Sequence, residues 1–244
     1  MSVAEKENPS VWEVLPEDGQ DWATSEGVLK GIDELSTALE NGADPDEEGA
    51  VLKAVIDGDI DVVKALHKAG AELLMARDYA ERSVLHYMSD AEVCEYVLEY
   101  TNNVDLQDIN GQTPLHDAVA CNDADKVWAL LDAGADLYIA DNDQWNAMHY
   151  AASYRADEQI IELLLDADTD NELFDLENNS GQTPWDIAED NGHADTIRSV
   201  IAQREKAQIT KALAEHMSPS ELMAQDDVQQ APSCEARQKA RRAM

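Results

Sequence analysis

One turn signature recurs along this chain and limits what it can fold into more than any other feature of the sequence. Residues 111–116 read GQTPLH, and residues 181–186 read GQTPWD. Weaker forms of the signature are QWNAMH at 144–149 and RSVLH at 82–86. A signature that returns in this way is typical of a stack of similar structural repeats, each in contact with its neighbours.

A second signature, Gly-Ala followed by an acid, marks the other end of the repeats. It is found at 42–44, 70–72 and 134–136, and more loosely as Asp168-Thr169-Asp170. The clearest repeat runs from Asp108 to Asp141, a register of 33 residues. The sequence therefore predicts an array built on this period.

Elementary helix rules give this repeat two short helices. Thr113 can cap a helix that starts at Pro114, where the missing amide hydrogen costs nothing. Leu115 then shares one face with Ala118 and Val119, three and four residues further on. Gly134 follows the second apolar segment, where a left-handed residue can end a helix.

A 33-residue period with Thr-Pro-Leu-His near its start and Gly-Ala-Asp near its end resembles the ankyrin repeat. The resemblance implies an all-α solenoid of stacked helix-turn-helix units with short β-turn or hairpin tips. It also implies that His86, His116 and His149 are structural and bond to the backbone of a neighbouring turn, rather than acting as ligands or bases.

The period divides the chain into an acidic N-terminal leader, an array of about six repeats, a helical extension and a mobile, finally basic tail. The leader is 1–20, the array 21–206, the helical extension 207–225 and the tail 226–244. Within the array, the six units lie near 21–45, 46–77, 78–107, 108–140, 141–177 and 178–206. In the degenerate first unit we expect a second helix on Ile32, Leu35, Ala38 and Leu39. Residues 202–217 contain neither Gly nor Pro, so the last helix of the array need not stop there, and a short helix is expected at 219–225.

Two units depart from the pattern, and both flank the regular fourth unit. From Leu85 to Glu92 the third unit has about three residues fewer than the fourth, so its helix pair should be clipped. The fifth unit has Gln144 in place of the turn glycine and an extended loop through residues 171–176. Insertions in repeat arrays map to loops on one face, which often bind partners.

The charge is extreme, with 52 acids and a formal net charge of −35. Such a charge disfavours nucleic acid and anionic membranes and attracts basic surfaces. Adaptation to a salty cytosol would also explain it. The sequence has neither a secretory signal, with its basic start and apolar run, nor an apolar stretch long enough to cross a membrane. Its three cysteines, Cys94, Cys121 and Cys234, are widely spaced. We therefore expect a cytoplasmic protein whose thiols are reduced.

The usual signatures of catalysis are absent from the sequence: it has no phosphate-binding glycine loop, nucleophile elbow or zinc-protease motif. Residues 57–61, DGDID, resemble the start of a calcium loop, but residues 66–68, LHK, stand where its bidentate acid should be. We read the segment as a turn with Asp59 or Asp61 at a helix start. No metal, cofactor or small-molecule substrate is expected.

By resemblance, partners dock on the turn tips and on the groove lined by the first helix of each pair. The residues carried over to those places are Tyr79, Arg82, Tyr87, Gln112, Asp117, Asp143, Trp145, Tyr150, Tyr154 and Gln182. Interfaces favour Tyr and Trp as rigid anchors, although some of these rings could instead pack between repeats. We expect Trp145 to be exposed, Trp185 to belong to the core, and Trp128 to face outward.

These observations predict a non-catalytic protein-binding module, monomeric before binding, that recognises a partner with a basic patch. A stoichiometric inhibitor or immunity-type protein is one form of this function, and a secreted host-directed effector or a scaffold is another. An enzyme with its catalytic residues outside the repeats is the alternative of a different class. The leader and tail, however, lack a His-acid-nucleophile set.

Overall fold

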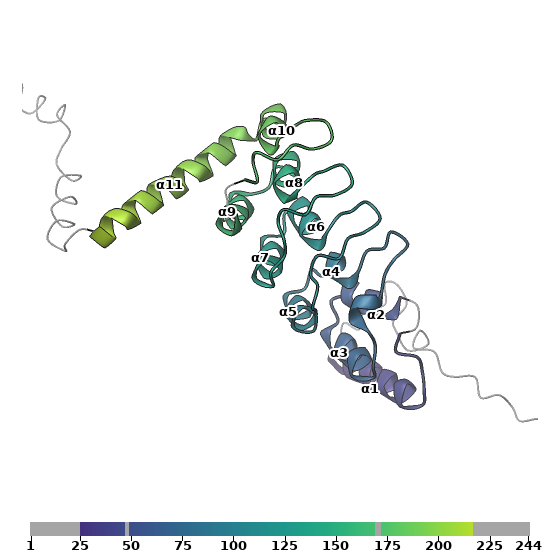
Figure 1. Cartoon of the computed structure of the whole chain (residues 1–244). Helices are drawn as coiled ribbons and strands as arrows, with labels where there is room; N and C mark the ends of the chain where they lie inside the picture. Colours follow the sequence, from purple (N-terminus) through teal and green to yellow (C-terminus); the bar gives the residue numbers. More distant parts are fainter. Residues whose placement is uncertain (1–24, 47–48, 169–171, 217–244) are drawn as a thin grey trace, which may run out of the picture. The chain divides into compact units, whose positions relative to one another are not determined.

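The computed structural model describes residues 25–46, 49–168 and 172–216 (Figure 1). The chain divides into two compact bodies, Met1–Ala194 and Asp195–Met244. The described elements are α1 Ser25–Glu40, α2 Ala50–Ile56, α3 Ile60–Lys68, the 3-10 helix η2 Leu73–Met75, α4 Val84–Tyr87, α5 Ala91–Glu99, α6 Pro114–Ala120, α7 Ala124–Asp132, α8 Ala147–Tyr154, α9 Glu158–Ala167, α10 Pro184–Asp190 and α11 Ala194–His216.

Within the first body, the helices form two rows. Helices α4, α6, α8 and α10 follow one another in the first row, and α5, α7 and α9 follow one another in the second (Figure 1). Loops extend from the first row on the side away from the second (Figure 1). The all-α arrangement of paired helices is the one predicted from the repeat period.

The fourth unit shows why this sequence forms a helix pair. Thr113 is the N-cap of α6 and Pro114 its first residue, as predicted. Leu115 and Val119 of α6 are buried together with Leu130 of α7, which joins the two helices through a common apolar core. Beyond α7, Gly134 has a φ of 89°, in the left-handed region that glycine adopts without steric cost.

Three histidines connect successive units, and the prediction for them is confirmed. In each, Nδ1 accepts a hydrogen bond from the backbone amide of the N-cap residue three positions earlier. The other ring nitrogen, Nε2, donates to a carbonyl of the next unit, at 3.2 Å from His86 to Gln112, 3.1 Å from His116 to Trp145 and 3.1 Å from His149 to Gln182. This pairing requires a neutral ring, which burial favours by lowering the pKa of each histidine.

The two irregular units have the expected departures. Helix α4 of the third unit has 4 residues where α6 of the fourth has 7, so the clipped helix is confirmed. In the long loop of the fifth unit, the side chain of Leu173 is fully buried. The carboxylate of Asp168 holds this loop by accepting hydrogen bonds from the Leu173 amide and from the Tyr138 hydroxyl, the latter at 2.5 Å.

The first unit differs from the predicted helix pair in its described part. Residues 25–40 form the single helix α1, because no turn signature or proline interrupts them. Leu35 and Ala38 are buried as predicted, and α1 contacts α3. Elsewhere, Asp59 caps α3 by accepting a hydrogen bond from the Val62 amide at 3.2 Å, so residues 57–59 form the turn between α2 and α3, and Asp61 lies in the first turn of α3.

Two further predictions concern the end of the array. Trp185 is half-buried rather than part of the core, since it lies edge-on to Phe174 with a ring separation of 6.2 Å and its indole N–H donates to Glu189. Helix α11 runs without a break through residues 206 and 207, as the absence of Gly and Pro predicts. The predicted leader, the short helix at 219–225 and the tail at 226–244 lie outside the described residues.

Among the described helices, none combines the length and apolar character needed to cross a membrane.

Candidate functional site

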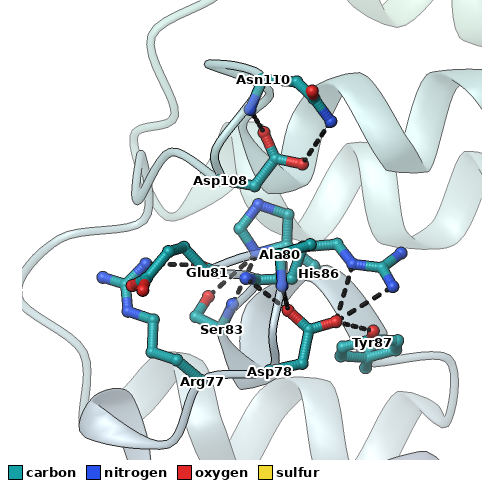
Figure 2. A network of polar contacts seen from close by, with 10 residues as sticks. Arg77, Asp78, Ala80, Glu81, Ser83, His86, Tyr87, Asp108 and Asn110 are labelled. Atoms are coloured by element: carbon teal, nitrogen blue, oxygen red, sulfur yellow. Dashed lines mark hydrogen bonds and ion pairs between the residues drawn. The ribbon is translucent and has the colours of Figure 1, made fainter.

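The loops that extend from the first row are closed by one repeated device. We call these loops the tips, and they comprise residues 78–82, 108–112, 141–145 and 178–182. Each tip begins with an Asp or Asn whose side-chain oxygen accepts hydrogen bonds from the backbone amides two and four residues later. These first residues are Asp78, Asp108, Asp141 and Asn178, and the eight bonds measure 2.8–3.0 Å. Figure 2 shows this arrangement in the third unit.

Neighbouring tips are also bonded to one another. The amide of Ile109 donates to the carbonyl of Ala80 at 2.9 Å, and the amide of Asn142 donates to the carbonyl of Asn110 at 2.9 Å. The side chain of Asn142 adds a bond to the carbonyl of Ile109 at 3.0 Å. A Cβ atom on Gly111 would lie 2.8 Å from the Asn142 amide nitrogen, so this close approach requires glycine. The tips therefore form a continuous, rigid edge.

A tyrosine holds the tip of the third unit from below. The Tyr87 hydroxyl donates to Asp78 Oδ2 at 2.5 Å (Figure 2), and Arg82 pairs with the same oxygen through Nη2 at 3.0 Å. The Arg82 guanidinium lies over the Tyr87 ring, 4.7 Å from its centre. Burial alone would raise the pKa of Asp78, but the hydrogen bonds from Tyr87 and from the Arg82 and Ala80 amides outweigh it and lower that pKa to about 2. Burial and the same bond raise the pKa of Tyr87 to about 12.

The fifth unit has the same device at the same position. The Tyr150 hydroxyl donates to Asp141 Oδ2 at 2.8 Å and accepts a hydrogen bond from the Gln112 amide group of the preceding unit. Burial is the largest of the effects that raise the pKa of Tyr150. Tyr150 is only 5% exposed, so it supports the tip and presents little surface of its own.

In the fourth unit an acid, Asp117, stands at this helix position, the fourth residue after the N-cap. Asp117 is half-buried, and no hydrogen bond to its carboxylate is found in the described part of the chain. The nearby cations have other acceptors, because Arg82 pairs with Asp78 and Lys126 donates to the His86 carbonyl. Burial raises the pKa of Asp117, although the nearby cations Lys126 and Arg82, and His86 whenever it is protonated, oppose that rise. The first row thus contains a half-buried carboxylate for which no hydrogen-bond partner is found among the described residues.

An aromatic row extends from the tip of the fifth unit along α8. The Trp145 and Tyr150 rings meet edge to face at 5.8 Å, and the Tyr150 and Tyr154 rings stack at 5.8 Å with an interplanar angle of 7°. Tyr154 at the end of the row is 58% exposed, whereas Trp145 is half-buried, which corrects the expectation that it is exposed. The accessible aromatic surface of this row is therefore Tyr154 and one part of Trp145.

The remaining predicted residues lie on the tips. Tyr79 is fully exposed at the tip of the third unit, and Asp143 is exposed at the tip of the fifth unit. Gln182 is half-buried and donates to Asp190 at 3.4 Å. The structure thus gathers the predicted residues into two groups on the first row. Arg82 and Tyr87 lie together with the Asp117 charge close by, and Gln112 joins the row of Trp145, Tyr150 and Tyr154.

Sequence reasoning missed two features of this region. The first is the acid or amide that begins each tip, although its recurrence at nearly the repeat period was a usable signal. The second is Lys126, which is 6% exposed and donates from Nζ to the His86 carbonyl at 2.7 Å. Burial lowers the pKa of Lys126. A lysine within an apolar helix stripe was its only trace in the sequence.

Within residues 25–46, 49–168 and 172–216, no three His, Cys, Asp or Glu side chains gather where they could hold a metal ion.

Comparison with known proteins agrees with this architecture. A family model described as ankyrin repeats (three copies) matches residues 51–141 and 134–212. The nuclear factor NF-kappa-B p105 subunit of Gallus gallus is 29% identical over 141 residues, 54% of this chain and 14% of that protein. The protein phosphatase 1 regulatory subunit 12A of Mus musculus is 30% identical over 131 residues, 51% of this chain and 11% of that protein.

A third relative, the SH3 and multiple ankyrin repeat domains protein 2 of Homo sapiens, is 29% identical over 145 residues, 54% of this chain and 8% of that protein. In each of the three, the similarity covers a small part of a much longer protein.

Proposed function

The chain belongs to the ankyrin-repeat family, whose members are protein–protein interaction modules, and we propose that it binds a partner protein carrying a basic patch. The proposed surface is the face formed by the tips and by the first-row helices α4, α6 and α8. The proposal includes no catalytic step, since modules of this family are generally non-catalytic.

The observation that carries this proposal is the Asp117 carboxylate. It is half-buried between units whose equivalent residues, Tyr87 and Tyr150, are already bonded to their own tips. A carboxylate removed from water in this way is stabilised by an arriving cation more strongly than a fully exposed one is. A Lys or Arg side chain of the partner, placed against Asp117, would supply that cation.

Aromatic contacts would hold the partner once it has arrived. Tyr154 is exposed and stacks on a ring that two hydrogen bonds fix, so little side-chain entropy is lost when a partner covers it. The many acids of the chain would accelerate and orient the encounter with a basic surface. Trp145 and Tyr154 therefore determine the dissociation rate, and the acids determine the association rate.

The test is affinity capture from a source lysate with four forms of the chain: wild type, Asp117→Asn, Tyr154→Ala with Trp145→Leu, and the control Glu162→Gln. Glu162 is an exposed acid on α9 of the second row. The control makes the same charge change as Asp117→Asn at a distance from the tips.

A partner retained by wild type and by the control but weakened by both other variants supports the proposal. A partner that all four forms retain equally would show that the surface is misplaced. If Asp117→Asn and the control weaken capture equally, the negative charge acts as a whole, which is what salt adaptation without a special partner predicts.

The activity of the bound partner distinguishes two forms of this function. A stoichiometric inhibitor would bind one basic enzyme at saturation and abolish its activity, whereas a scaffold or effector would bind without abolishing it. We also propose a cytoplasmic location, supported by the free thiols of Cys94 and Cys121 among the described residues.

A further inference from the structure

A groove lies in the second row of helices, away from the tips. It runs between α5 and α7, which lie side by side (Figure 1), and has a cavity volume of about 630 Å³. Cys94, Leu98 and Ala129 contribute to its lining, and Trp128 stands at its edge with 57% of its surface exposed.

The fold does not require a tryptophan at this position. On α7 the core is made by Val127 and Leu130, which are fully buried, while Trp128 points to the other side of the helix. An exposed tryptophan next to a partly apolar groove is the arrangement found at the centre of protein interfaces, where buried aromatic side chains contribute most of the binding energy.

The rim of the groove is acidic. Glu95 of α5 and Asp125 and Asp132 of α7 line it and are exposed. Lys126 also lines the groove but is buried, with its ammonium group bonded to the His86 carbonyl at 2.7 Å. The groove therefore presents apolar surface surrounded by carboxylates, with the nearby cation turned inward.

We propose that this groove is a second docking surface, which takes a basic amphipathic helix of a partner protein. Its apolar side would lie on Trp128, Leu98 and Ala129, and its Lys and Arg side chains would meet Glu95, Asp125 and Asp132. Helices α5 and α7 have 9 residues each. At 1.5 Å per residue, each is about 13 Å long, which is enough for between two and three turns of the docked helix. This surface is independent of Asp117, which lies on α6 in the first row.

The probe is a labelled helical peptide of leucine and lysine, ~18 residues or about five turns long, with a leucine–glutamate peptide of equal length as its counterpart. Fluorescence anisotropy measures its affinity for the full chain. We expect the basic peptide to bind, the acidic peptide not to bind, and Trp128→Ala to weaken binding at least about tenfold. Unchanged affinity in Trp128→Ala would overturn the proposal.

A matched pair of charge reversals separates the groove from the overall charge of the chain. Glu95→Lys with Asp132→Lys changes the rim, and Glu158→Lys with Glu162→Lys makes the same charge change at exposed positions on α9. We expect the first pair to weaken binding about tenfold and the second pair to change it less than about twofold. Equal weakening by both pairs would mean that the peptide is held by net charge alone, and the groove would be rejected.

A final variant places the peptide on one row or the other. Asp117→Asn should leave its affinity unchanged, because Asp117 lies outside the groove. Loss of binding in Asp117→Asn would place the peptide on the first row and contradict the proposal.

Discussion

The fourth and fifth units carry different residues at the same position of their first helix. In the fifth, the Tyr150 hydroxyl bonds to Asp141 and so supports the tip above it. In the fourth, Asp117 stands at that position, and the carboxylate of Asp108 is bonded instead by the Asn110 side chain at 3.4 Å. The same position of the repeat thus supports the tip in the fifth unit, whereas in the fourth unit it carries a carboxylate with no hydrogen bond from the described residues.

The third unit agrees with the fifth, since Tyr87 bonds to Asp78 there. Asp117 is therefore flanked by two units that have the supporting tyrosine. This contrast makes opposite predictions for the two kinds of unit: removing a tyrosine should cost stability, whereas removing the acid should cost affinity for a partner.

The largest effect is expected at Tyr150. Tyr150→Ala removes a buried ring and should lower the free energy of unfolding by about 3–5 kcal/mol. Tyr150→Phe removes only the hydroxyl, deprives Asp141 Oδ2 of the hydrogen bond from that hydroxyl, and should cost about 1.5–3 kcal/mol. Urea denaturation measures both. The control is Tyr154→Phe, whose exposed ring should tolerate the change within about 0.5 kcal/mol. Equal, small losses for Tyr150→Phe and Tyr154→Phe would remove the distinction between the two positions.

The next effect is acid destabilisation through His116. Burial is the main cause that lowers the pKa of His116 to about 4, whereas the unfolded chain binds that proton near pH ~6.5. The unfolded state therefore binds more protons between these values, so the stabilisation is complete above that range and is lost as the pH falls through it. On the order of 3 kcal/mol should be lost by pH ~4.

Urea denaturation across this pH range, in wild type and in His116→Gln, measures the loss. The variant should be less stable at neutral pH but should depend less on pH. The same slope in both proteins would mean that other groups cause the acid destabilisation.

Asp117→Asn should change two quantities in opposite directions. Affinity for the captured partner should fall about tenfold or more, because a hydrogen bond to a charged group contributes about 1.5–3 kcal/mol. Since burial raises the pKa of Asp117, the folded state holds its proton more tightly, and stability is lost as the pH rises through that pKa. The asparagine variant lacks this loss, so its thermal midpoint at neutral pH should rise. A lower midpoint would show that the carboxylate is already stabilised within the protein.

Local rules explain why so much of the fold was predictable. Thr113, Pro114 and Gly134 act through backbone geometry within one turn of helix, and the three histidines repeat one contact at a fixed offset. Whether a ring is buried depends instead on the neighbouring unit. Tyr150 was correctly placed on the first helix, but its burial follows from Asp141 and from Gln112 of the preceding unit.

The same reasoning applies to the other missed features. Trp185 takes a position that is normally apolar and buried, yet its indole N–H bonds to Glu189 at the surface. The partner of Lys126 lies 40 residues earlier in the chain, beyond any local pattern. Contacts of this kind follow from how the units stack, and they decide which of the predicted groove residues remain accessible.

The smallest effect is expected at Lys126, whose side chain links the fourth unit to the clipped third unit. The corresponding position is occupied by Val62 in α3, Val93 in α5 and Ile160 in α9, all of them buried. Of the four helices α3, α5, α7 and α9, α7 alone has a charged residue there. Helix α4 ends after one turn, and Lys126 bonds to the carbonyl of His86 near that end. Lys126→Met keeps the volume and loses this bond but no longer buries a charge. The loss of the hydrogen bond and the relief from burying a charge nearly cancel, so the free energy of unfolding should change by less than about 1 kcal/mol.

Lys126→Ala is the matched control, because it also leaves a cavity and should cost at least about 2 kcal/mol. A pH series sharpens the comparison. Burial lowers the pKa of Lys126, so the folded wild type releases this proton first and gains stability as the pH rises through that pKa. The methionine variant lacks this gain, so wild type should become the more stable of the two at alkaline pH. If Lys126→Met lost as much stability as Lys126→Ala at neutral pH, the hydrogen bond to His86 would be what holds the clipped unit in the stack.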